Sequence, residues 1–110
     1  MTELSITKEH IEGRYWRYLG RIDGIDGAAE IVYTQRGPDL ISADHTEATE
    51  SMKGTGAAAA LVVYMVEDAR KHGFKIMPLC PYVFAQYQKH PEWADVMTIA
   101  PGEDQSALFG

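Results

Sequence analysis

Two glycines one residue apart, Gly54 and Gly56, stand before an alanine-rich segment with the spacing of a helix. The first backbone N–H groups of a helix have no partners inside it, and the helix dipole adds partial positive charge at that end. Because glycine has no Cβ, the phosphates of a ligand can approach the main chain closely at such a turn. The turn therefore suits a pyrophosphate, and the alternative is a flexible loop that only begins a helix.

The single cysteine of the chain, Cys80, stands before Pro81 at the start of a second expected helix. Proline is favourable at the first position of a helix, and a helix N-terminus stabilises a thiolate. Cys80 is therefore a candidate nucleophile; the alternative is a small buried core residue, as free cysteine often is. A thiol redox protein is a weaker interpretation, since the chain has no second cysteine to resolve an intermediate.

His45 and Glu47 lie two residues apart in one expected strand. The side-chain period of two predicts that they share a face with Ile41 and Ala43. A carboxylate or an imidazole can take a proton from an incoming amine, directly or through water. We favour Glu47 as the base and His45 as its partner or as the partner of Cys80. The alternatives are a hydrogen-bonded core histidine and a solvated glutamate at the end of the strand.

The elements that must position these residues follow from hydrophobic periodicity and turn signals. The expected strands cover residues 4–10, 14–19, 28–35, 40–48 and 75–79. The expected helices begin at Gly54 or Thr55 and at Cys80-Pro81, and they end near His72 and His90. Apolar residues at helical spacing predict the buried stripe of the first helix, which comprises Ala58, Val62, Met65, Val66 and Ala69.

A strand, a helix and a strand in succession imply a parallel pair joined by a right-handed crossover. We therefore expect an α/β or α+β fold with a mixed sheet. The 110 residues suit a single domain, expected over residues 1–100 and ending in a helical turn or strand at residues 93–99. The polar residues 101–110 are expected to form a flexible tail.

Composition excludes several classes of function. The formal net charge of −6 argues against non-specific binding to nucleic acid. The N-terminus lacks the basic start and apolar run of a signal peptide, and the longest apolar run, residues 57–66, is too short to span a bilayer. One cysteine permits no internal disulfide and fits a reducing cytoplasm. A Walker-type nucleotide hydrolase is excluded, since Lys53 precedes Gly54 and no Gly-Lys-Ser/Thr occurs.

Five separated signatures occur in one order along the chain. They are His45-Thr46-Glu47, Gly54-x-Gly56, Ala69-Arg70-x-x-Gly73-x-Lys75, Pro78-x-Cys80-Pro81-Tyr82-Val83 and Lys89-His90-Pro91-Glu92. With them, the chain from roughly Gly13 to Val96 resembles the GCN5-related N-acetyltransferase (GNAT) superfamily, and more closely its short YjdJ-type single-domain members. The resemblance implies a truncated GNAT-like fold, with a mixed central sheet, a splayed parallel strand pair and two main helices.

The resemblance also implies a site for acetyl-CoA or coenzyme A. The pyrophosphate would lie on the backbone amides of residues 53–57, and the pantetheine would run beside residues 46–49 like an additional strand. The thioester would lie in the gap between the splayed strands, which Cys80 would face. The implied binding residues are Thr46, Glu47, Ala48, Thr49, Lys53, Gly54, Thr55, Gly56, Ala57 and Tyr82. Ser51 departs from the family pattern, which has glutamine or arginine there. No metal site is assigned.

Tyr87 lies seven residues after Cys80. Ordinary members of the superfamily often have an asparagine and a tyrosine at this spacing, and the tyrosine protonates the leaving thiolate. Here the cysteine stands where the asparagine would be. Tyr87 is thus a candidate general acid, with Tyr82 as the fallback, and the alternative for Tyr87 is aromatic core packing.

We therefore expect an acetyltransferase that uses acetyl-CoA to acetylate an unidentified amine, on a small molecule or a protein. Direct attack in a ternary complex is the expected mechanism, and an acyl-Cys80 intermediate is the alternative. A non-catalytic acyl-CoA-binding or interaction module is the alternative function, because the chain is too short for the N-terminal helices that shape the acceptor site in ordinary members. Neither nucleic acid nor a membrane is an expected partner, and the oligomeric state is left open.

Overall fold

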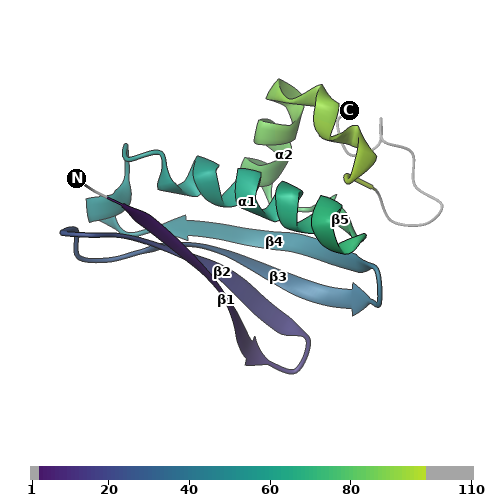
Figure 1. Ribbon diagram of the computed structural model, residues 1–110, viewed down its shortest axis with the longest axis horizontal. Coiled ribbons are helices and arrows are strands. Elements are labelled where there is room, and N and C mark those ends of the chain that lie inside the picture. The colour runs from purple at the N-terminus through teal and green to yellow at the C-terminus, as the bar shows by residue number, and fades with distance from the viewer. Residues whose placement is uncertain (1–2, 99–110) are drawn as a thin grey trace.

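The computed structural model describes residues 3–98, which form one mixed sheet with two α-helices and two short 3₁₀ helices (Figure 1). The expected tail, residues 101–110, lies outside the described residues, as does the very end of the expected domain. The elements are β1 (Leu4–Glu12), β2 (Tyr15–Ile22), β3 (Ala29–Gly37), β4 (Leu40–Ala48), η1 (Glu50–Met52), α1 (Ala57–His72), β5 (Lys75–Pro78), α2 (Pro81–Lys89) and η2 (Pro91–Asp95).

The sheet has the strand order β1-β2-β3-β4-β5. The first four strands are joined by short turns and pair antiparallel, whereas β5 returns after α1 and pairs parallel to β4. The expected fold class, a mixed sheet with two main helices, is therefore confirmed. Within residues 3–98, no helix is both long and apolar enough to cross a membrane.

Helix α1 lies along one face of the sheet (Figure 1). It begins at Ala57 rather than at the expected Gly54 or Thr55, because Gly54 and Gly56 have φ angles of 79° and 83°, outside the range of a right-handed helix. Its buried stripe comprises Ala57, Leu61, Val62, Met65, Val66 and Ala69. The expected stripe was thus wrong at Ala58, which is half-buried, and it omitted Ala57 and Leu61.

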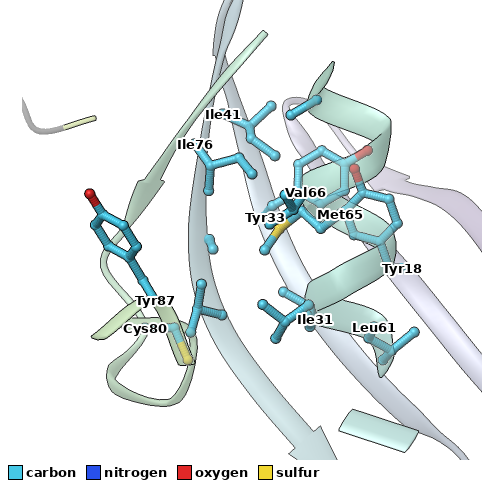
Figure 2. Packing of buried hydrophobic residues seen from close by; sticks show 14 of the residues in the cluster. Tyr18, Ile31, Tyr33, Ile41, Leu61, Met65, Val66, Ile76, Cys80 and Tyr87 are labelled. Carbon is cyan, nitrogen blue, oxygen red and sulfur yellow. The ribbon is translucent and has the colours of Figure 1, made fainter. Parts of the chain in front are cut away.

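Most of the core lies between α1 and the face of the sheet that α1 covers, and Cys80 and Tyr87 extend it to α2 (Figure 2). Tyr18 of β2 stacks on Tyr33 of β3, with ring centroids 4.9 Å apart, and its hydroxyl donates a 2.8 Å hydrogen bond to Asp68 of α1. Burial, assisted by this hydrogen bond, raises the pKa of Tyr18 well above its usual range. Lys8 of β1 lies 2.7 Å from the same carboxylate, so the edge strand is also tied to the helix.

The segment after α2 returns to the outer edge of β5. The Ile76 N–H donates to the Val96 carbonyl at 2.7 Å, and a further bridge joins Ile76 to Met97. Arg70 of α1 anchors this segment with two 2.9 Å hydrogen bonds to the carboxylate of Asp95. Short as it is, β5 therefore has backbone partners on both of its edges.

Candidate functional site

Strand β4 has a partner on its β5 side along only part of its length. Leu40–Ala43 pairs with Lys75–Pro78, and the last link is a 2.7 Å hydrogen bond from the Cys80 N–H to the Ala43 carbonyl. From there β4 continues to Ala48, whereas the chain after β5 turns into α2. The two parallel strands therefore separate, as expected, and leave a gap beside residues 44–48.

A β-bulge at Asp44 marks the point of separation. Tyr33 pairs with Ala43 and Val32 pairs with His45, so Asp44 is an extra residue in β4. Because a bulge shifts the alternation of side chains by one residue, Thr46 rather than His45 follows Ala43 on the helix-covered face.

The expectation that His45 and Glu47 share a face with Ile41 and Ala43 is therefore wrong. Ile41 and Ala43 are buried, with 1% and 0% of their surface exposed, whereas the His45 and Glu47 side chains are 57% and 66% exposed. These two do share a face with one another, and the His45 Nε2 lies 3.1 Å from the Glu47 Oε1. They lie on the face opposite α1, which we call the open face, since among residues 3–98 no helix covers it over β1 to β3 (Figure 1).

The backbone of the second half of β4 is directed into the gap at Thr46 and Ala48. The Thr49 N–H donates to the Ala28 carbonyl at 3.0 Å, and Glu47 pairs with Glu30, so these residues use the β3 edge. Backbone groups alternate between the two edges of a strand. The N–H and C=O groups of Thr46 and Ala48 therefore point to the edge that has no strand partner among the described residues.

Cys80 lies at this gap as the N-cap of α2 and is only 4% exposed. Its sulfur is hydrogen-bonded to the Thr46 hydroxyl, with Sγ and Oγ1 3.2 Å apart. The thiol is thus brought together with Thr46, and not with His45 or Glu47, which lie on the other face. Sequence reasoning selected Thr46 for its backbone only, because nothing local links two residues 34 positions apart.

The turn before α1 uses some of its own amides. The Lys53 N–H donates to the Glu50 carbonyl at 3.3 Å, and the Thr55 N–H donates to the Met52 carbonyl at 3.2 Å. The Thr55 hydroxyl accepts a 3.2 Å hydrogen bond from the Ala57 N–H. Three of the five amides expected to hold a pyrophosphate therefore already have acceptors.

The amides of Gly54, Gly56, Ala58 and Ala59 have no acceptor within residues 3–98. All four belong to the turn or to the first turn of α1. A Cβ built on Gly54 or Gly56 would meet nothing within 4 Å, so the space beside both is open. The turn thus presents unpartnered donors at the positive end of a helix dipole, a combination that binds anions.

Ser51, the residue that departs from the family pattern, fastens this turn to the β2–β3 loop. Its hydroxyl donates to the Asp26 carbonyl and lies 3.0 Å from the Thr49 hydroxyl, which in turn accepts from the Ala28 N–H at 3.1 Å. Only glycine fits at position 27, beneath this cluster. Any other residue would place its Cβ within 2.1 Å of the Thr49 hydroxyl oxygen.

The two candidate acids on α2 differ in position. Tyr87 is 8% exposed and belongs to the core cluster, and in Figure 2 its hydroxyl points away from the Cys80 sulfur. Tyr82, in the first turn of α2, is half-buried against the core, and burial raises its pKa.

The open face carries a groove of about 670 Å³ that runs from β2 to the end of β4. Its lining includes the exposed Glu47 together with Thr46, Ala48, Thr49 and Lys53, all of which were selected from the sequence. Residues that were not selected complete the groove: Arg17, Leu19, Arg21, Ala28 and Glu30. Arg17 and Arg21, which share one face of β2, were a sequence signal for part of this lining.

The chain was compared with curated proteins and with models of protein families. No curated protein matches the chain. A family model described as GCN5-related N-acetyl-transferase matches residues 17–96, from β2 to the residue after η2. That range contains the splayed strands, the turn before α1 and Cys80, whereas the YjdJ-type subgroup stays a prediction. Because the match extends over most of the sequence, the chain belongs to the GCN5-related N-acetyltransferase family.

Proposed function

We propose that the protein transfers an acetyl group from acetyl-CoA to an amine. The observation that carries the proposal is the succession of two sets of backbone groups without partners among residues 3–98: the edge of β4 at Thr46 and Ala48, and the amides at Gly54 and Gly56. Family membership supports acetyl transfer as the class of reaction.

The two sets of groups suit different parts of one donor. Pantetheine contains two amide groups, so it can pair with the β4 edge at Thr46 and Ala48 as a short strand does. The pyrophosphate then lies on the amides of Gly54, Gly56 and the first turn of α1. In this arrangement the thioester reaches the gap where β4 and β5 separate, beside Cys80.

Glu47 acts as general base from the open face, with His45 as its partner. It takes a proton from the ammonium form of the acceptor, and the free amine nitrogen attacks the thioester carbonyl carbon. The C–N bond forms as the C–S bond breaks, and the nitrogen loses its remaining extra proton to solvent. The CoA thiolate gains a proton from Tyr82, in the first turn of α2, and Tyr87 is the less favoured acid because its hydroxyl points away from the Cys80 sulfur (Figure 2).

Two other interpretations have support from particular contacts. The hydrogen bond between Cys80 and Thr46 supports an acyl-Cys80 route. In this route the Cys80 sulfur attacks the thioester carbonyl, and CoA leaves as a thiol with the proton that Cys80 loses. The amine then attacks the acyl-Cys80 carbonyl, and the Cys80 sulfur leaves and takes up the proton that the amine loses. Cys80 contacts Thr46 on the helix-covered side of β4, whereas His45 and Glu47 both lie on the open face, and this separation supports a non-catalytic acyl-CoA-binding module.

Calorimetric titration with acetyl-CoA, CoA and ATP tests the proposal. We expect micromolar binding of both CoA ligands and none of ATP, because ATP cannot occupy the β4 edge. With an amine panel, Glu47→Gln should lose turnover and keep CoA affinity, which a passive binder could not show. An acetyl mass gain that disappears in Cys80→Ala would support the covalent route, and absence of CoA binding would refute the proposed function.

A further inference from the structure

The groove on the open face indicates what kind of amine the site accepts. Resting on the proposed function, we propose that the acceptor is a small amine that also carries a carboxylate. Its carboxylate binds Arg21 at the β2 end of the groove, and its amine lies toward Glu47 at the β4 end.

The register of the sheet gives the groove its layout. Leu19, Glu30 and Glu47 lie side by side across β2, β3 and β4. Gly20 pairs with Ala29, so the next residue of β2, Arg21, lies beside Ala28. Arg21 is therefore one row further along the open face than Leu19. The groove therefore has Arg21 and Glu47 at its two sides and the buried Leu19, which is 6% exposed, in its floor.

The three cations of the groove differ in how they are paired. Arg17 lies 2.8 Å from Glu9 and 3.0 Å from Glu30, and hydrogen bonds to both carboxylates raise its pKa. Lys53 lies 2.8 Å from Glu50. No carboxylate of residues 3–98 lies within ion-pairing distance of Arg21, which acts on Glu9 only at longer range. Arg21 is therefore the cation of the groove that a ligand can engage.

A guanidinium can hold a carboxylate by two parallel hydrogen bonds. Two acidic side chains in the groove, Glu30 and Glu47, and a net charge of −6 favour a singly charged anion over a phosphate dianion. The Glu47 side chain is 66% exposed, and His45 is its one ion-pair partner within residues 3–98, so its carboxylate suits the ammonium group of the same ligand.

The dimensions favour a ligand whose two charged groups are separated by a flexible spacer. Adjacent strands lie about 4.8 Å apart, so β2 and β4 are about 10 Å apart across the groove. A volume of about 670 Å³ is in the range of small-molecule sites. A chain of methylene groups between the amine and the carboxylate would span the groove and contact Leu19.

The test compares 6-aminohexanoate with hexylamine, which share an alkyl amine and differ in the carboxylate. Binding to the full chain is measured by NMR titration with and without CoA, and acetylation by release of CoA. We expect 6-aminohexanoate to bind at least about tenfold more tightly, and Arg21→Ala to abolish that preference. Arg14→Ala is the matched control, since Arg14 is exposed outside the groove and should leave the preference unchanged.

Equal binding of the two amines by the wild-type protein would overturn the inference. It would also be overturned if Arg21→Ala weakened binding of CoA but not of dephospho-CoA, because Arg21 would then serve the 3′-phosphate of the donor. A failure of the proposed function looks different: acetyl-CoA would not bind, while the carboxylate preference would still be measurable by NMR on the protein alone.

Discussion

The two halves of β4 belong to one strand but have different surroundings. Leu40–Ala43 is paired on both edges, and Ile41, Ser42 and Ala43 are buried. Among the described residues, the half from Asp44 to Ala48 is paired with β3 alone, and its side chains are exposed or half-buried. The change occurs at one residue, the bulge at Asp44.

Within the nine residues of β4, the first half therefore serves the stability of the fold and the second half serves the proposed function. Side chains of the first half pack in the core, and its backbone completes the sheet. In the second half the backbone at Thr46 and Ala48 is left without a strand partner among the described residues, and the titratable pair His45 and Glu47 faces outward. Substitutions in the first half should therefore cost stability, and those in the second half should cost activity.

The largest effect is expected for Glu47→Gln. Loss of a general base should lower turnover by roughly 10²- to 10⁴-fold, whereas the stability and the affinity for CoA should be unchanged because the side chain is exposed. Steady-state rates, urea unfolding and calorimetry measure the three quantities. The control is Glu67→Gln on the exposed side of α1. Equal activity of both variants would show that Glu47 is not the base.

Ile41→Ala tests the first half of β4. The side chain is 1% exposed in the core cluster, so its truncation should lower the free energy of unfolding by roughly 2–5 kcal/mol. Turnover per folded molecule should be unchanged. The matched control is Val63→Ala on α1, which is 43% exposed and should change stability by about 0.5 kcal/mol or less. A loss for Ile41→Ala no larger than that of the control would contradict the comparison.

Sequence reasoning predicted the first half of β4 better than the second. The order of elements and most boundaries were predictable from three signals. These are the alternation of side chains in β2 and β3, the turn signals, and Gly73 after α1. The bulge at Asp44 has no local signal, because the ladder with β3 produces it, and an error of one residue reversed the face of His45 and Glu47. The contact between Cys80 and Thr46 is likewise tertiary, so periodicity could not predict it.

Thr46→Val should have a smaller effect, since it removes only the hydroxyl that meets the Cys80 thiol across the gap. We expect a loss of roughly 0.5–1.5 kcal/mol in the free energy of unfolding. In a Cys80→Ala background the same change should cost less, because the partner is already absent. Identical losses in both backgrounds would show that the two residues do not interact.

The smallest effect concerns the anchor that holds η2 against the outer edge of β5. Hydrogen bonds from Arg70 lower the pKa of Asp95, so the folded state binds that proton less tightly than the unfolded state does. The stabilisation is complete above the usual aspartate pKa of about 4 and is lost as pH falls through the lowered value. Urea unfolding should thus show a small stability difference between wild type and Asp95→Asn at pH 6 that shrinks at pH 3. A difference that grows on acidification would contradict this sign.

Amide hydrogen exchange by NMR, with and without saturating acetyl-CoA, tests most directly whether the unpaired half of β4 is the donor site. The Thr46 and Ala48 amides should exchange rapidly in the free protein and slowly in the complex, because pantetheine would become their hydrogen-bond partner. The Glu47 amide, which lies on the β3 edge, should change little. If acetyl-CoA binds and the Thr46 and Ala48 amides exchange as before, the donor lies elsewhere and the central claim is wrong.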